Sequence, residues 1–235
     1  MTAVNPGSAR PARTTQRFLH GRVELALHTY QGTSGPSLVL LHGLGEASPE
    51  VAPAMFANWP GSIHALDFTG HGASSVPAGG GYSCEVLMAD VDGALARLGP
   101  STIFGRGLGG YVGLLIAGAR ASLVRGLLID DGAGLTGGGV RPGSTMIFVP
   151  DLRLASGHAP TPDPLALLEL GSDVRPPDYA ESFVRAALQG PLEDPISVVG
   201  VSRPPWLRAV ADCYGVRTEA ISSALDRFGR SAAPA

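Results

Sequence analysis

The stretch STIFGRGLGGYVGLLIAGA, residues 101–119, decides the fold. Its first four residues are a short run typical of a buried strand, and Tyr111–Ala119 continues with the apolar pattern of a helix. Between them, glycine occupies every second position of the turn GRGLG at 105–109. A strand that runs through a tight turn into a helix predicts a βαβ unit, and therefore a mainly parallel sheet covered by helices.

Length and composition exclude several classes of function. The 235 residues are enough for one substantial core, and 44% hydrophobic with 16% charged residues is typical of a globular chain. A net charge of −3 argues against nucleic acid or an anionic membrane as partner. The absence of lysine excludes Schiff-base chemistry, and the two cysteines form no zinc motif. We expect a cytoplasmic protein with no membrane span, metal or cofactor, and the sequence leaves its oligomeric state open.

The remaining pattern predicts one domain with a tail and a cap. Residues 1–17 contain arginines but no apolar run, so they predict a flexible tail rather than a secretory signal, and 18–235 form the domain. The glycine- and proline-rich segment 132–177 suits a small cap or lid over a pocket. Strands are expected at 22–30, 37–41, 63–67, 101–104, 124–129 and 196–201. Helices are expected at 48–59, 83–98, 111–119, 164–170, 179–188, 207–213 and 218–228.

Two further segments accompany the glycine turn: LVLLHGLG at 38–45 and LDFTGHGASS at 66–75. In this order the three resemble the α/β-hydrolase superfamily. The first is similar to the strand and turn that supply half of that family's oxyanion hole, and the second to its D-x-x-G-H-G-x-S loop. The turn at 105–109 has the glycine spacing of the nucleophile elbow, G-x-Ser-x-G. The resemblance covers about residues 22–131 and implies a three-layer α/β fold with a mainly parallel sheet.

The resemblance also implies where an oxyanion would be held. A nucleophile on a sharp strand–helix turn lies above the sheet, beside a helix N-terminus whose N–H groups can bind an oxyanion. In this sequence the two donors would be the N–H groups of Leu44 and Leu108, which follow Gly43 and Gly107. Both are backbone groups, so neither depends on the side chain at position 107.

Three departures from the family pattern bear on function. Gly107 stands where the family has its serine, and no histidine follows His158, so the late general base is missing. The last strand is also expected to be missing, because 196–201 is followed almost directly by the terminal helix. Asp130 and Asp131, at a strand end, are candidates for the acid. Loss of a triad costs about 10⁶-fold in rate in the best-dissected case, so ordinary ester hydrolysis is not expected.

Glycine at position 107 has a physical interpretation of its own. An elbow holds its central residue at positive φ, which strains a non-glycine residue by about 1–3 kcal/mol and glycine not at all. Glycine is therefore expected at an elbow whose central residue takes no part in catalysis. An engineered serine-to-glycine trap is the alternative, but a trap would keep the late histidine.

The same turn matches a second fingerprint. Residues 105–110 read G-x-G-x-x-G after a strand and before a helix, and Asp130 lies twenty residues further on, where a dinucleotide fold places its ribose-binding acid. Against this interpretation, two βα units precede the turn. It also leaves the segments 38–45 and 66–75 unexplained.

Three functional hypotheses remain from the sequence. The favoured one is a catalytically degenerate α/β-hydrolase-like protein that binds a small apolar acyl or carbonyl compound, or a partner protein. The second is a non-serine hydrolase or lyase, with water activated by His42 or His158 and the oxyanion held by Leu44 and Leu108 N–H. The third is a dinucleotide-binding protein.

Overall fold

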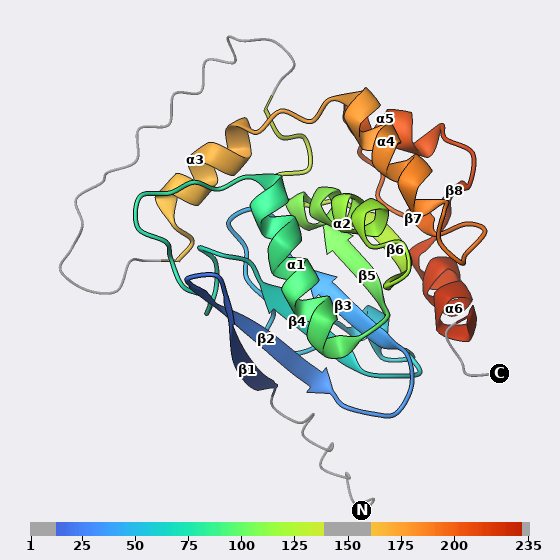
Figure 1. The fold of residues 1–235 in the computed structure, drawn as a ribbon. Helices are drawn as coiled ribbons and strands as arrows, with labels where there is room; N and C mark the ends of the chain where they lie inside the picture. Colours follow the sequence, from blue (N-terminus) through green and yellow to red (C-terminus); the bar gives the residue numbers. More distant parts are fainter. Residues whose placement is uncertain (1–12, 139–160, 232–235) are drawn as a thin grey trace, which may run out of the picture.

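The computed structural model describes residues 13–138 and 161–231, which form one sheet flanked by helices (Figure 1). Within these residues the sheet has eight strands in the order β1-β2-β4-β3-β5-β6-β7-β8. The strands are β1 Thr14–His20, β2 Val23–Gln31, β3 Ser37–Leu41, β4 Ile63–Asp67, β5 Ser101–Arg106, β6 Val124–Asp130, β7 Ile196–Val198 and β8 Val216–Thr218. The helices are α1 Cys84–Leu98, α2 Leu108–Ala119, α3 Pro164–Ser172, α4 Pro177–Ala187, α5 Pro205–Ala211 and α6 Ile221–Ser231, with a 3₁₀ turn, η1, at Ala54–Phe56.

The sheet is mainly parallel, as the βαβ pattern predicts. Strands β1, β2 and β4 pair antiparallel, whereas β4, β3, β5, β6, β7 and β8 pair parallel along the rest of the sheet. Because the parallel strands share one direction, their carboxyl ends meet at one edge, where the turns after β3 and β5 lie side by side.

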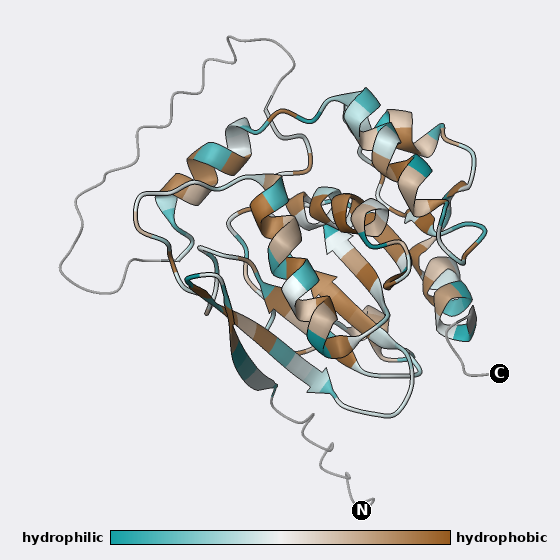
Figure 2. Ribbon diagram, in the orientation of Figure 1, coloured by the Kyte–Doolittle hydropathy of each residue, from teal (hydrophilic) through white to brown (hydrophobic). Residues whose placement is uncertain are grey.

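The helices cover both faces of the sheet and complete three layers. Helices α1 and α2 pack on one face, and η1 and α6 pack on the other through Phe56 and Phe228. Hydrophobic residues concentrate in the central strands and in α2 (Figure 2). Ten of the twelve residues of α2 are buried, because this helix lies between the sheet and α4. A helix that is apolar on all sides is stable only in such a buried position.

Most expected elements are present, and helix α1 shows why the prediction works. Ser83 accepts a hydrogen bond from Val86 N–H at the start of the helix, and Gly99 ends it at φ 75°. Serine and glycine are the residues that cap these two ends best. The apolar positions between them face the core.

The expected helix at 48–59 is wrong, since one 3₁₀ turn forms in its place. Proline has no N–H to donate and its ring clashes with the carbonyl four residues earlier. Pro53 therefore prevents a helix from continuing through the segment, and helical structure begins only after it, at Ala54.

Two expectations about the ends of the sheet are also wrong. Strand β8 is present and pairs parallel with β7, so the last strand is not missing. It was overlooked because it has three residues, none of them buried. Strand β1 begins at Thr14, inside the segment 1–17 predicted as a tail, and one of its seven residues is buried. Neither strand carries the apolar alternation that signals a strand in sequence.

The cap stays a prediction, because residues 139–160 of the segment 132–177 lie outside the described part of the chain. The part that follows packs on the domain through α3. Tyr82 donates its hydroxyl to Asp163, and Glu169 accepts the N–H groups of Gly81 and Tyr82. No helix in the described ranges is long and apolar enough to cross a bilayer.

Candidate functional site

The turn between β5 and α2 has the backbone of an elbow. Gly107 adopts φ 57° and ψ −120°, and α2 begins at the next residue. The flanking glycines allow close packing of the turn: a Cβ on Gly105 would lie 2.6 Å from the Cα of Gly110, and one on Gly109 would lie 2.5 Å from Leu41 O. The positive φ that the elbow interpretation requires is therefore present.

The turn after β3 holds His42 in a structural role. Phe68 N–H donates to Nε2 of His42 at 3.1 Å, and Nδ1 lies 2.8 Å from Gly43 O. This pattern leaves the ring proton on Nδ1 and occupies both nitrogens. Burial lowers the pKa of His42 to about 4, with a further contribution from His71. At neutral pH the ring is uncharged and has no nitrogen left to activate water.

The two N–H groups expected as oxyanion donors point at one oxygen atom, which belongs to the protein itself. Leu44 N–H and Leu108 N–H donate to the carbonyl oxygen of Ala133 at 3.0 and 2.9 Å. Ala133 lies in the segment 131–138 that follows β6, called here the β6 loop. A peptide carbonyl of this loop thus occupies the position where the family resemblance places a substrate oxyanion.

The β6 loop also fills the space that a side chain at position 107 would need. A Cβ built on Gly107 would lie 2.6 Å from the carbonyl carbon of Gly132 and 2.8 Å from the nitrogen of Ala133, and closer still to Ala133 O. Real Cβ atoms do not approach backbone to such distances. A serine at position 107 is therefore incompatible with the present position of the loop.

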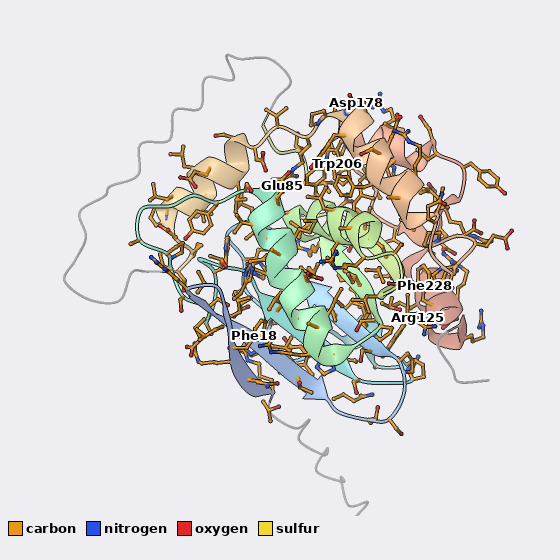
Figure 3. All side chains as sticks on the ribbon, viewed as in Figure 1. Phe18, Glu85, Arg125, Asp178, Trp206 and Phe228 are labelled. Carbon is orange, nitrogen blue, oxygen red and sulfur yellow. The ribbon has the colours of Figure 1, made fainter. Side chains whose placement is uncertain are left out.

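Two buried side chains fix the β6 loop from the side of α4 and α5. Arg175 is 3% exposed and donates to the carbonyls of Gly134 and Leu135. Trp206, which lies between α2 and the α4–α5 pair (Figure 3), donates its indole N–H to Leu135 O at 2.8 Å. Arg175 and Trp206 both contact the ring of Tyr111. No sequence motif points to these residues, and the sequence gives no signal that they meet the elbow.

The two acid candidates, Asp130 and Asp131, lie at the end of β6 and directly after it. Asp131 accepts the N–H groups of Val201 and Ser202 at 2.7 and 2.9 Å. Burial favours the protonated acid, but these hydrogen bonds outweigh it and lower the pKa of Asp131. Both of its carboxylate oxygens thus anchor the loop after β7. Asp130 ends β6 beside Arg106, and His158 lies outside the described residues.

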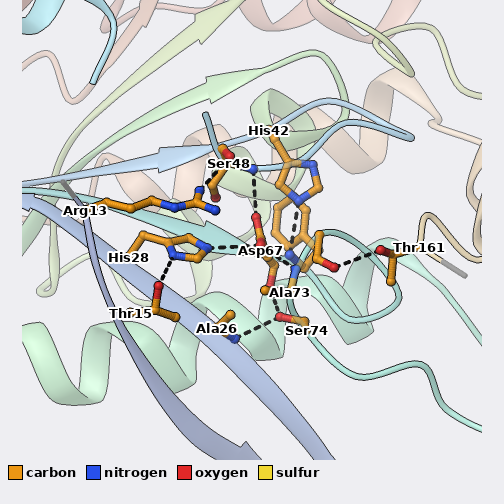
Figure 4. Close-up of polar contacts among 12 residues, drawn as sticks. Arg13, Thr15, Ala26, His28, His42, Ser48, Asp67, Ala73, Ser74 and Thr161 are labelled. Atoms are coloured by element: carbon orange, nitrogen blue, oxygen red, sulfur yellow. Dashed lines mark hydrogen bonds and ion pairs between the residues drawn. The ribbon is translucent and has the colours of Figure 1, made fainter. Parts of the chain in front are cut away.

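The D-x-x-G-H-G loop is organised around buried Asp67 (Figure 4). His28 lies 3.0 Å from its carboxylate, and the N–H groups of Ser48 and Ala73 donate to it at 2.7 Å. Burial opposes ionisation, but these hydrogen bonds prevail and hold the pKa of Asp67 well below its usual range. Thr15 of β1 completes the network at 2.8 Å from His28. The loop therefore has a structural role, and the sequence did not indicate that His28 and Thr15 take part.

Comparison with known proteins agrees with this geometry. The model of the alpha/beta hydrolase family matches residues 38–234. The chain belongs to the α/β-hydrolase family. No curated protein sequence matches it. Within the described residues of this family member, no group of three or more histidine, cysteine, aspartate or glutamate side chains could hold a metal ion.

Several solved α/β-hydrolase structures are similar to part of the chain. A hydrolase from Pseudomonas aeruginosa PA01 is 27% identical over 49% of this chain and 45% of its own, with a TM-score of 0.42. E-2-(acetamidomethylene)succinate hydrolase is 26% identical over 52% and 45%, with a TM-score of 0.43. The thioesterase domain from the curacin biosynthetic pathway is 20% identical over 56% and 49%, with a TM-score of 0.47. The chain thus matches less than half of the length of each.

Proposed function

We propose that this α/β-hydrolase family member does not catalyse the serine-hydrolase reaction and instead binds a small apolar compound. The observation that carries the proposal is the shared acceptor of Leu44 and Leu108 N–H. Both donors are used by Ala133 O, so they are not available to a developing oxyanion. Removing one such donor in an enzyme costs about 10²–10³ in rate, and here both are engaged.

The side chains of the site support the same conclusion. Gly107 supplies no attacking atom. The carboxylate of Asp131 and the ring of His42 are both bonded to backbone. A catalytic triad needs a nucleophile, a base and an acid that bond to one another, and these residues bond elsewhere.

The alternatives from the sequence find less support. A non-serine hydrolase that uses His42 would need a free ring nitrogen, and both nitrogens of His42 have partners. A dinucleotide would need the N–H groups at the start of α2 for its phosphates, and Leu108 N–H donates to Ala133 O. The chain keeps the α/β-hydrolase fold, and binding of a ligand is the function that this geometry supports best.

The test is steady-state hydrolysis of short- and medium-chain p-nitrophenyl esters by the wild type and by Gly107→Ala. The wild type is expected at the background rate because it has neither a nucleophile nor free oxyanion donors, and Gly107→Ala is expected there too because alanine supplies no nucleophile. A wild-type kcat of about 1 s⁻¹ or more, the lower end of ordinary enzymes, would contradict the proposal. His42→Ala and His158→Ala would then identify the base.

A further inference from the structure

One crossover of the sheet has no full helix, and a cavity lies beneath it. The connections from β4 to β5, from β5 to β6 and from β7 to β8 each contain a helix, whereas the connection from β3 to β4 contains η1. Two cavities, of about 590 and 360 Å³, border this turn, and both are lined by Pro53 and Phe56. The space results from the proline that prevents a helix at 48–59.

The smaller cavity has an apolar floor built on the sheet. Leu40 of β3, Ala65 of β4 and Phe104 of β5 line it, each less than 10% exposed. Phe56 covers these residues and meets Phe104 edge-on, with ring centroids 4.9 Å apart. The cavity has about twice the volume of the 150 Å³ apolar cavity that takes up benzene. It therefore has room for a two-ring aromatic molecule.

The polar groups of the cavity favour an uncharged ligand. Glu46 and Arg106, both among the lining residues, form an ion pair and neutralise each other. The wall contributed by His42 is uncharged near neutral pH, since burial lowers the pKa of the ring to about 4.

The hydroxyl of Ser48 does not face the cavity. Ser48 is 7% exposed, and its Oγ is enclosed by protein beside Asp67, whose pKa it helps to lower. The cavity therefore offers a ligand an apolar surface bordered by one ion pair, that of Glu46 and Arg106.

We propose that this cavity binds a neutral two-ring aromatic molecule. The cavity lies on the sheet face covered by η1 and α6, and its lining residues His42, Glu46 and Arg106 flank the two turns that carry the N–H groups of Leu44 and Leu108. The inference rests on the proposed ligand-binding role and names the class of ligand.

The test uses 2-naphthol as the probe and follows its fluorescence during titration of the full chain. Saturable binding with one molecule per chain is expected for 2-naphthol. The charged 2-naphthoate, which has the same rings, is expected to bind at least tenfold more weakly, because its carboxylate would have to compete with Glu46 for Arg106. Equal or tighter binding of 2-naphthoate would overturn the assignment of a neutral ligand.

Two matched variants locate the site. Ala47 is exposed and lines the cavity, whereas Ala54 is exposed and is not among the lining residues. Ala47→Phe places a ring over the opening and is expected to weaken 2-naphthol binding at least tenfold, while Ala54→Phe leaves it unchanged. The absence of saturable binding up to millimolar 2-naphthol, or wild-type affinity in Ala47→Phe, would overturn the proposal.

These outcomes are independent of the test for catalysis. Ester turnover by a chain whose 2-naphthol binding is lost in Ala47→Phe would contradict the catalytically silent elbow and leave the cavity assignment intact. If the chain shows no turnover and Ala47→Phe binds 2-naphthol as well as the wild type does, the cavity assignment fails and the proposed lack of catalysis stands.

Discussion

At the scale of single residues, Gly107 satisfies two constraints at once. Its φ of 57° lies in the left-handed region, where a side chain is strained, and backbone atoms of the β6 loop occupy the position of its Cβ. Either constraint alone favours glycine. Together they show that the present position of the β6 loop requires glycine at position 107.

Gly107→Ser should therefore destabilise the fold more than backbone strain alone would. Strain costs about 1–3 kcal/mol, and forcing atoms into a filled space typically costs about 1–3 kcal/mol more. Gly21 is the matched control, because it has φ 59° and nothing within 4 Å of a Cβ. Urea unfolding should give a loss for Gly107→Ser that exceeds that of Gly21→Ser by at least about 1 kcal/mol. Equal losses would mean that the β6 loop does not press on position 107.

At the scale of elements, the β6 loop is held by side chains that come from far away in the sequence. Trp206 of α5 and Arg175, which precedes α4, both donate to Leu135 O. Ala133 O in turn accepts two N–H groups from the turns after β3 and β5. The loop thus links the α4–α5 side of the molecule to the elbow, and its position depends on all of these contacts.

Replacing Trp206 with phenylalanine should loosen this link while preserving most of the packing. A single hydrogen bond contributes about 1 kcal/mol, which corresponds to a roughly fivefold change in local opening. Amide hydrogen exchange should accelerate about fivefold at Leu44 and Leu108, whose N–H groups depend on the loop. The amide of Ile103 within β5 serves as the internal control and should exchange as in the wild type. Unchanged exchange at Leu44 and Leu108 would show that Trp206 does not position the loop.

The elements also show which parts of the structure were predictable from sequence. Strand β3 and helix α1 have the apolar pattern and capping residues of their type, and both lie where they were expected. The segment 48–59 has a helical apolar pattern, but Pro53 overrides it. Strands β1 and β8 are held by pairing with a neighbouring strand rather than by burial of their own side chains. No local sequence pattern therefore predicts them.

The candidate site was predictable only where a motif fixes the backbone. The glycine turn predicted the positive φ of Gly107, and the family resemblance of this turn and of the segment 38–45 predicted the donors Leu108 N–H and Leu44 N–H. Their acceptor, Ala133 O, belongs to a loop with no motif, and the contacts that hold it arise from tertiary packing. Sequence reasoning could identify the glycine at position 107 but not the carbonyl that accepts from both N–H groups.

At the scale of the whole molecule, several histidines are buried in the sheet and in the loops that cross its edge. Burial lowers the pKa values of His42, His64 and His71, so all three favour the neutral form in the folded state. In the unfolded chain these rings take up protons near the ordinary histidine pKa of about 6.5. The fold is therefore stabilised by conditions that keep its histidines neutral.

The stability of the protein should consequently fall as the pH is lowered from about 6.5 to about 4. In this window the unfolded state binds more protons than the folded state, so the free energy of unfolding rises with pH and is lost on acidification. His42, with its pKa at about 4, should account for about 3 kcal/mol of the difference between pH 7 and pH 4. Glutamine can donate to Gly43 O and accept from Phe68 N–H without titrating. The test is the free energy of unfolding against pH for the wild type and for His42→Gln: the variant should lose less stability on acidification, and parallel curves would mean that His42 is not held neutral by the fold.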